Sequence, residues 1–197
     1  MNDRRTEILE ATCMIVAQGG VRDLSLQKVA DQMGLSFDEV DRHFPTEMEL
    51  ISSAFDHADG RATAYVADRI QAETTVQRLT HLLTFYIDDA PEIREDWIFW
   101  MELETGAIYD PGIREVVTDQ TGMWLAMIAG LIRAVQSEGN IDEHLDPDAS
   151  ALRLCLIQDS LAKQNVIGWI TVDDARTEMV RALDHELGLH ATAESDA

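Results

Sequence analysis

Aromatic side chains, carboxylates and polar groups collect in the middle of the chain, where they could bind a small molecule. The set is Trp97, Trp100, Met101, Glu104, Tyr109, Met123, Trp124, Met127 and Gln158. Ring faces attract cations and nearby carboxylates neutralise them, so this combination suits a cationic amine. Tryptophans and methionines at helical spacing also commonly fill a core. The sequence leaves a ligand pocket and a packed interior as alternatives.

Residues that could catalyse a reaction or hold a metal are less well organised. The histidines form no metal-binding repeat, and we find neither a nucleophile elbow nor a phosphate-binding glycine loop. Asp56, His57 and Asp59 could hold a divalent ion, although a solvated acidic helix face explains them more simply. Cys13 and Cys155 have no redox or metal-ligand spacing, and we expect buried free thiols. We therefore expect no enzyme, no metal site and no cofactor.

The charge balance argues against a polyanionic partner. The 197 residues include 37 acidic and 15 basic ones, for a net charge of −22. Such a charge weakens the encounter with nucleic acid, whose affinity comes largely from neutralised phosphates. The same composition also suits a salt-rich cytoplasm, which screens surface charge. Neither a membrane-length apolar run nor a signal peptide is evident, so we expect a cytoplasmic protein with no membrane partner.

Helical periodicity dominates the chain, and no stretch alternates like a half-buried strand, so the sequence predicts an all-α fold. Glycines, prolines and capping residues divide it into nine helices. They span about 4–18, 25–33, 36–43, 46 towards 70, 76–87, a sixth containing 97–100 and ending near 106, 111–137, 147–167 and 172–187. Capping boxes are expected at Ser36 with Glu39 and at Thr46 with Glu49.

The first fifty residues contain a short helix, a glycine turn and a second short helix, which together form a helix-turn-helix. The run from Ile8 to Leu50 carries Gly20, Ser25, Val29-Ala30, Gly34-Leu35-Ser36 and His43-Phe44 at matching positions, and it resembles the tetracycline-repressor (TetR) family. The helix count and the tryptophan-rich sixth helix resemble the choline-responsive, BetI-like branch of that family. The domains expected are 1–50 for DNA binding and 51–190 for ligand binding and dimerisation, with a disordered tail over 191–197.

The resemblance implies a homodimeric transcriptional regulator, usually a repressor, in which a small-molecule effector alters the separation of two DNA-reading helices. The implied DNA-binding residues are Ser25, Gln27, Ser36, Phe37, Asp41, Arg42, His43, Thr46 and Glu47. The last two helices would form the dimer interface through Leu152, Leu156, Leu161, Met179 and Leu183. These apolar residues could instead fill the core of a monomer.

Two positions depart from the family pattern where it normally contacts the DNA backbone. Asp41 stands where the family usually has tyrosine, and Glu47 where it usually has lysine. Residues 1–55 contain ten acids and five bases, a net −5 that contrasts with the basic surface expected for DNA binding. Two hypotheses follow. The protein binds operator DNA despite its charge, or it has lost operator binding and acts by pairing with a second regulator, for example a basic DNA-binding relative.

Overall fold

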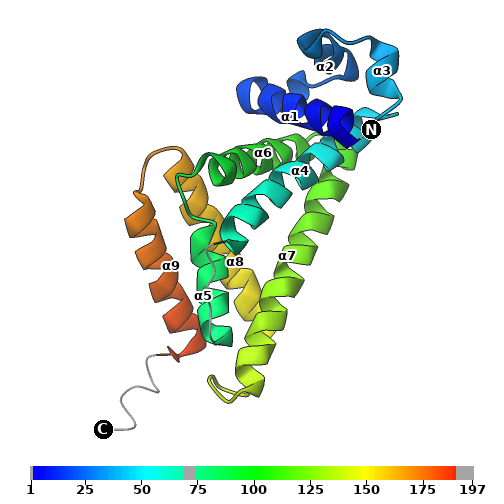
Figure 1. Ribbon diagram of the computed structural model, residues 1–197. Helices are drawn as coiled ribbons and strands as arrows, with labels where there is room; N and C mark the ends of the chain where they lie inside the picture. Colours follow the sequence, from blue (N-terminus) through cyan, green and yellow to red (C-terminus); the bar gives the residue numbers. More distant parts are fainter. Residues whose placement is uncertain (1, 69–73, 190–197) are drawn as a thin grey trace. The chain divides into compact units, whose positions relative to one another are not determined.

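The computed structural model describes residues 2–68 and 74–189, with side chains from residue 4 onward (Figure 1). Over these ranges the chain forms helices and no strands, which confirms the expected all-α, nine-helix fold. The elements are α1 (Asn2–Gly19), the 3-10 turn η1 (Val21–Asp23), α2 (Leu26–Met33), α3 (Phe37–Asp41), α4 (Glu47–Ala67), α5 (Thr75–Phe85), α6 (Pro91–Ala107), α7 (Pro111–Ser137), α8 (Pro147–Val166) and α9 (Val172–Leu187). The expected tail over 191–197 lies outside the described residues.

Local signals set most helix ends where the sequence predicts them. Ser25 caps α2 by accepting a hydrogen bond from Lys28 N, and Gly34 ends that helix in the left-handed conformation at φ 67°. Thr46 Oγ1 accepts a hydrogen bond from Glu49 N at the start of α4. Gly188 ends α9 at φ 67°, a backbone conformation that favours glycine.

The expectation of a capping box at Ser36 is wrong. The Ser36 hydroxyl makes no capping hydrogen bond, because Glu39 N donates instead to the Ser36 carbonyl oxygen at 3.1 Å. The Glu39 carboxylate pairs with Arg4 Nε at 3.5 Å. Helix α3 ends at Asp41, two residues before the predicted end. A capping box that the prediction missed, between Thr74 and Gln77, opens α5.

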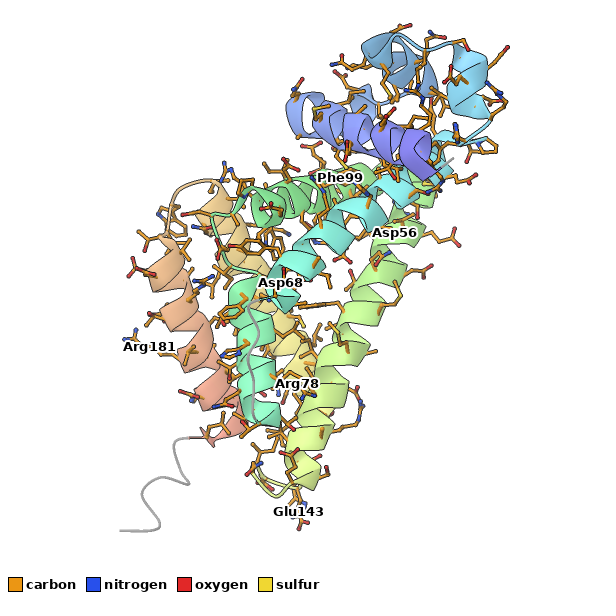
Figure 2. All side chains as sticks on the ribbon, viewed as in Figure 1. Asp56, Asp68, Arg78, Phe99, Glu143 and Arg181 are labelled. Atoms are coloured by element: carbon orange, nitrogen blue, oxygen red, sulfur yellow. The ribbon has the colours of Figure 1, made fainter. Side chains whose placement is uncertain are left out.

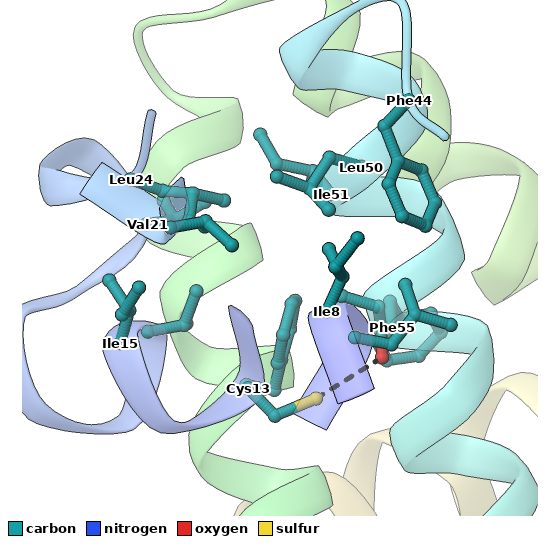
Figure 3. Packing of buried hydrophobic residues seen from close by; sticks show 14 of the residues in the cluster. Ile8, Cys13, Ile15, Val21, Leu24, Phe44, Leu50, Ile51 and Phe55 are labelled. Carbon is teal, nitrogen blue, oxygen red and sulfur yellow. Dashed lines mark hydrogen bonds between the residues drawn. The ribbon is translucent and has the colours of Figure 1, made fainter. Parts of the chain in front are cut away.

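The first of two compact units comprises the described residues among 1–65 together with 91–119. Its apolar core joins the helix-turn-helix to α4 and α6, with Ile8, Phe44 and Leu50 fully buried (Figure 3). Within it the Cys13 thiol donates to the Ala54 carbonyl oxygen at 3.5 Å, and burial raises the pKa of Cys13 to about 11. Phe99 of α6 belongs to the same core. The helix-turn-helix therefore shares one apolar core with α4 and α6.

The second unit takes in the described residues among 66–90 and 120–197. Helices α8 and α9 pack side by side and both contact α5. The Gln158 amide donates to the Leu83 carbonyl oxygen at 2.9 Å, and Arg176 pairs with Asp88 at 2.6 Å. Cys155 is a buried free thiol, as Cys13 is. Helix α4 spans residue 50 without a break. The domain boundary expected at residue 50 stays a prediction.

Candidate functional site

Several candidate DNA-contacting residues on α2 and α4 have roles in the fold itself. Ser25 and Thr46 each cap the helix that follows them. The Gln27 amide donates to Asp31 Oδ1 at 2.7 Å on the exposed side of α2. Glu47 is exposed at the first position of α4, where the helix dipole favours a carboxylate.

Helix α3 presents few positive groups. Ser36 and Phe37 are exposed at its start, while Asp41 and His43 are half-buried near its end. The exposed Arg42 turns back along the helix, and its Nε donates to the Asp38 carbonyl oxygen at 3.1 Å. Helix α3 therefore presents the exposed ring of Phe37 next to acidic side chains.

The other bases of residues 4–55 also have partners within the chain. Arg4 pairs with Glu7, and Lys28 pairs with Asp23 at 3.2 Å. The remaining two arginines lie over aromatic rings: Arg5 is 4.6 Å from the centre of Phe44, and Arg22 is 5.7 Å from the centre of Tyr109. Exposed ion pairs contribute about 1 kcal/mol or less, so a phosphate could replace such a partner.

The nine residues expected to line a pocket divide between the two units. Trp97, Trp100, Met101, Glu104 and Tyr109 lie in the first unit, and Met123, Trp124, Met127 and Gln158 in the second. In the first, the Trp100 ring packs against Phe55 at 5.4 Å between centroids, while Tyr109 is 70% exposed. In the second, Trp124 contacts Tyr86 edge-on, and Gln158 is committed to the α5 backbone. A single pocket formed by all nine stays a prediction.

The structure singles out a residue that the sequence analysis did not, Asp96 of α6. It is 8% exposed, and its Oδ1 has no hydrogen-bond partner among the described residues. Burial raises the pKa of Asp96 to about 8, nearby Asp59 raises it further, and Arg61 opposes the shift. A sequence signal existed, because Asp96 interrupts an apolar stripe formed by Ile93 and Phe99.

Asp96 belongs to a set of ionisable side chains that α4 and α6 bring together. We call the set the α4–α6 polar cluster, and it consists of His57, Asp59, Arg61, Glu95 and Asp96. Arg61 and Glu95 form an ion pair at 2.7 Å. Burial raises the pKa of Asp59 and lowers that of His57. The described chain offers no hydrogen-bond partner to His57 Nε2, Arg61 Nε or Asp96 Oδ1, all of which are buried. Figure 2 draws the side chains of both helices, with Asp56 of α4 and Phe99 of α6 labelled.

The described side chains of the polar cluster do not have the arrangement of a metal site. No group of three or more His, Cys, Asp or Glu side chains over 2–68 and 74–189 could hold a metal ion. This includes Asp56, His57 and Asp59, which the sequence left as a weak candidate. The buried carboxyl group of Asp96 can accept a proton or a positively charged group.

The residues expected at a dimer interface differ in exposure. Leu152 is 47% exposed and Leu156 60%, on the outer side of α8, and Leu161 is half-buried. Met179 and Leu183 are fully buried against the rest of the chain and have no surface left for a partner. The interface hypothesis is therefore reduced to the α8 leucines. Among the described helices, none is long and apolar enough to cross a membrane.

Comparison with known proteins places these features in context. Residues 75–188 match the family model of the BetI-type transcriptional repressor C-terminal domain. A crystal structure of a protein assigned to the TetR-family regulators of Rhodococcus sp. is 30% identical and has a TM-score of 0.86. The alignment covers 95% of this chain and all of that one.

Two further relatives carry a functional description. A protein from Saccharomonospora viridis, assigned as a transcriptional regulator and solved in complex with choline, is 25% identical with a TM-score of 0.77. That alignment covers 94% of this chain and 97% of the other. The HTH-type transcriptional regulator PksA of Bacillus subtilis (strain 168) is 22% identical over 178 residues, which cover 90% of this chain and 85% of PksA.

Proposed function

Because the chain belongs to the TetR family of transcriptional regulators, we propose that it is a homodimeric, DNA-binding repressor that responds to a small organic cation. The observation that supports this ligand class is the buried carboxylate oxygen of Asp96, which has no hydrogen-bond partner among the described residues and lies one helical turn before Trp100 in α6. The BetI-type match and the choline complex of the Saccharomonospora viridis protein support the same class.

DNA binding in this proposal relies on α3 and on the first turn of α4. Asp41 and Glu47 weaken the phosphate contacts there, so we expect lower affinity than a basic helix-turn-helix would give. An acidic side chain can still accept a hydrogen bond from cytosine N4. The alternative, a regulator that acts only through a partner protein, is less well supported, because the relatives that match over most of the chain are described as transcriptional regulators.

Dimerisation in this proposal uses the outer side of α8. Leu154 and Gln158 bury the other side of that helix within the chain, which leaves Leu152 and Leu156 exposed. We expect the double substitution Leu152→Glu and Leu156→Glu to give a folded monomer in sedimentation velocity. Leu156→Met, which keeps an apolar side chain of similar volume, should remain a dimer. A dimer formed by the double variant would exclude α8 as the interface.

A gel-shift titration with DNA from the region flanking the gene tests the function directly. The folded dimer should retard this DNA at ~50 mM salt and release it as salt rises, because the affinity depends on phosphate contacts. Choline should lower the affinity at constant ionic strength, with sodium chloride as the matched control. If the folded dimer retards no DNA at low salt, the repressor proposal fails and the partner-binding alternative is favoured.

A further inference from the structure

Helices α4 and α6 contact each other through aromatic rings, and carboxylates lie one helical turn from these ring contacts. Phe55 of α4 contacts both Phe99 and Trp100 of α6, with ring centroids 6.0 and 5.4 Å apart. One helical turn from these contacts lies Asp59 on α4, and one turn away on α6 lies Asp96. Asp59 is close enough to raise the pKa of Asp96, so the two carboxylates lie at the same end of the ring contact.

Among the described residues, the nearby Arg61 forms no ion pair with Asp96, although its charge lowers the pKa of that carboxyl group. Its Nη2 pairs with Glu95 at 2.7 Å, and its buried Nε has no hydrogen-bond partner in the described chain. Asp96 Oδ1 is left without a hydrogen-bond donor, although the residue is more than nine-tenths buried. A buried carboxylate needs a proton or a cation, since leaving it charged and unpaired is costly.

We propose that Asp96 is the counter-ion of the effector: its carboxylate, with Asp59 beside it, receives a small ammonium group that packs against the rings of Phe55 and Trp100. Two carboxylates supply the opposite charge, and the ring faces supply cation–π attraction to the methyl or methylene groups around nitrogen. This assignment rests on the proposed function and deepens it, because it names the residue that distinguishes a cation from a neutral molecule of the same shape.

Binding should displace a proton. The pKa of about 8 means that Asp96 is largely protonated at neutral pH in the free protein, whereas an ammonium group favours the ionised form. The other titratable or charged groups near this position are Asp56, His57, Asp59 and Arg61 on α4, Glu95 on α6, and Glu10 and Cys13 on α1. We assign the released proton to Asp96, because this buried carboxyl group is the one without a hydrogen-bond donor at Oδ1.

Isothermal titration calorimetry of the full-length protein tests the assignment with two probes of nearly the same shape. Choline carries the charge, and 3,3-dimethylbutan-1-ol replaces its nitrogen with carbon. We expect choline to bind the wild type more tightly, with an affinity that rises close to tenfold from about pH 6 to pH 7. Titrations in phosphate and in Tris should reveal the release of about one proton per choline at neutral pH.

The isosteric variant Asp96→Asn should bind choline at least tenfold more weakly, bind the alcohol as the wild type does, and release no proton. Glu49→Gln, which removes one carboxylate from the exposed side of α4 outside the α4–α6 polar cluster, should bind choline as the wild type does. Choline binding that is equally tight in wild type and Asp96→Asn would overturn the assignment while the proposed function stands. Failure of the wild type to bind choline at all would overturn both the assignment and the cationic effector.

Discussion

Carboxylates in two regions of this molecule do different things. On the helix-turn-helix, Asp38 and Glu47 are exposed and Asp41 is half-buried. On α6, Asp96 is buried and its Oδ1 lacks a donor. Surface carboxylates therefore act on the choice of partner, whereas the buried one acts on stability and on the ligand.

Two different solution variables should separate these roles. Interactions of surface charges are screened by salt over roughly 10 Å at ordinary ionic strength, so DNA binding should respond strongly to salt. A buried carboxylate is screened little, and its charge state is set by pH. Salt titrations should therefore report on the helix-turn-helix, and pH titrations on the α4–α6 polar cluster.

Asp96→Asn should give the largest change, in the pH dependence of stability. The folded-state pKa of Asp96 is raised to about 8 from its ordinary value of 3.8, so the folded state holds a proton that the unfolded state loses between these values. The stability that this proton provides is fully present below the unfolded pKa and is lost as pH rises to about 8. The slope is on the order of 1.4 kcal/mol per pH unit, and the total on the order of 6 kcal/mol.

Urea unfolding of the wild type and of Asp96→Asn, at several pH values between about 5 and 8, measures this difference. The variant should lose less stability than the wild type as pH rises, because asparagine needs no proton. Comparing the two removes the contribution of the high net charge, which both share. If the free energies of unfolding of the wild type and of Asp96→Asn depend on pH in the same way, Asp96 behaves like a surface carboxylate, and the proposed difference between the two regions is wrong.

Restoring the expected family residues with Asp41→Tyr and Glu47→Lys should have the next largest effect, on DNA affinity. The double variant removes two carboxylates and gains a cation, so we expect roughly 10- to 100-fold tighter binding at moderate salt. The slope of log affinity against log salt should steepen by about 1 for the added lysine.

Gel-shift titrations against the same DNA at several salt concentrations would check this effect. Asp173→Tyr with Glu178→Lys, on exposed positions of α9, makes the same change in charge outside the helix-turn-helix and serves as the matched control. If the control gains as much affinity as the test variant, total charge decides binding and the two positions have no special role. If neither gains affinity, Asp41 and Glu47 do not limit binding.

Glu102 differs from both groups of carboxylates, because it is half-buried and has a hydrogen-bond partner. We expect its substitution to have the smallest effect. Glu102 of α6 is half-buried, and its Oε2 accepts a hydrogen bond from Val21 N at 3.2 Å, just after Gly20. Removing the acceptor with Glu102→Leu should cost about 0.5–1.5 kcal/mol of the free energy of unfolding.

Glu102→Gln retains a carbonyl oxygen and should recover most of this loss in the same urea titration. The φ of 82° at Gly20 explains why glycine precedes Val21, because other residues rarely adopt this backbone conformation. A Cβ on Gly20 would also lie 2.5 Å from Glu102 Oε2, so the carboxylate would have to move. Equal destabilisation by the leucine and glutamine variants would show that the charge of Glu102, and not its hydrogen bond, matters.

The interior of the helix-turn-helix could be predicted far better than the candidate ligand site. Val29, Ala30 and Leu50 recur at helical spacing in the sequence and are all fully buried. The ligand prediction relied on tryptophans and stays a prediction, since Trp124 packs edge-on against Tyr86 in the second unit. Asp96 was missed because one acid within an apolar stripe looks the same in sequence whether it reaches solvent or not.

The sequence by itself determined most of the positions where helices begin and end, because these choices are local. Pro111 and Pro147 open helices since a first-turn proline loses no hydrogen bond, and Gly34 and Gly188 end them in a conformation that other residues avoid. The acidity of the reading helix was likewise evident from composition.

Only the tertiary structure decided which side chains are withdrawn from water. The periodicity of α8 and α9 shows an apolar face but not what covers it, so Leu156 and Leu183 look alike in sequence although one is exposed and the other buried. The environment of Asp96 likewise depends on the packing of α6 against α4, about forty residues earlier in the chain. Burial depends on contacts between distant segments, and helical periodicity records only the neighbours within one helix.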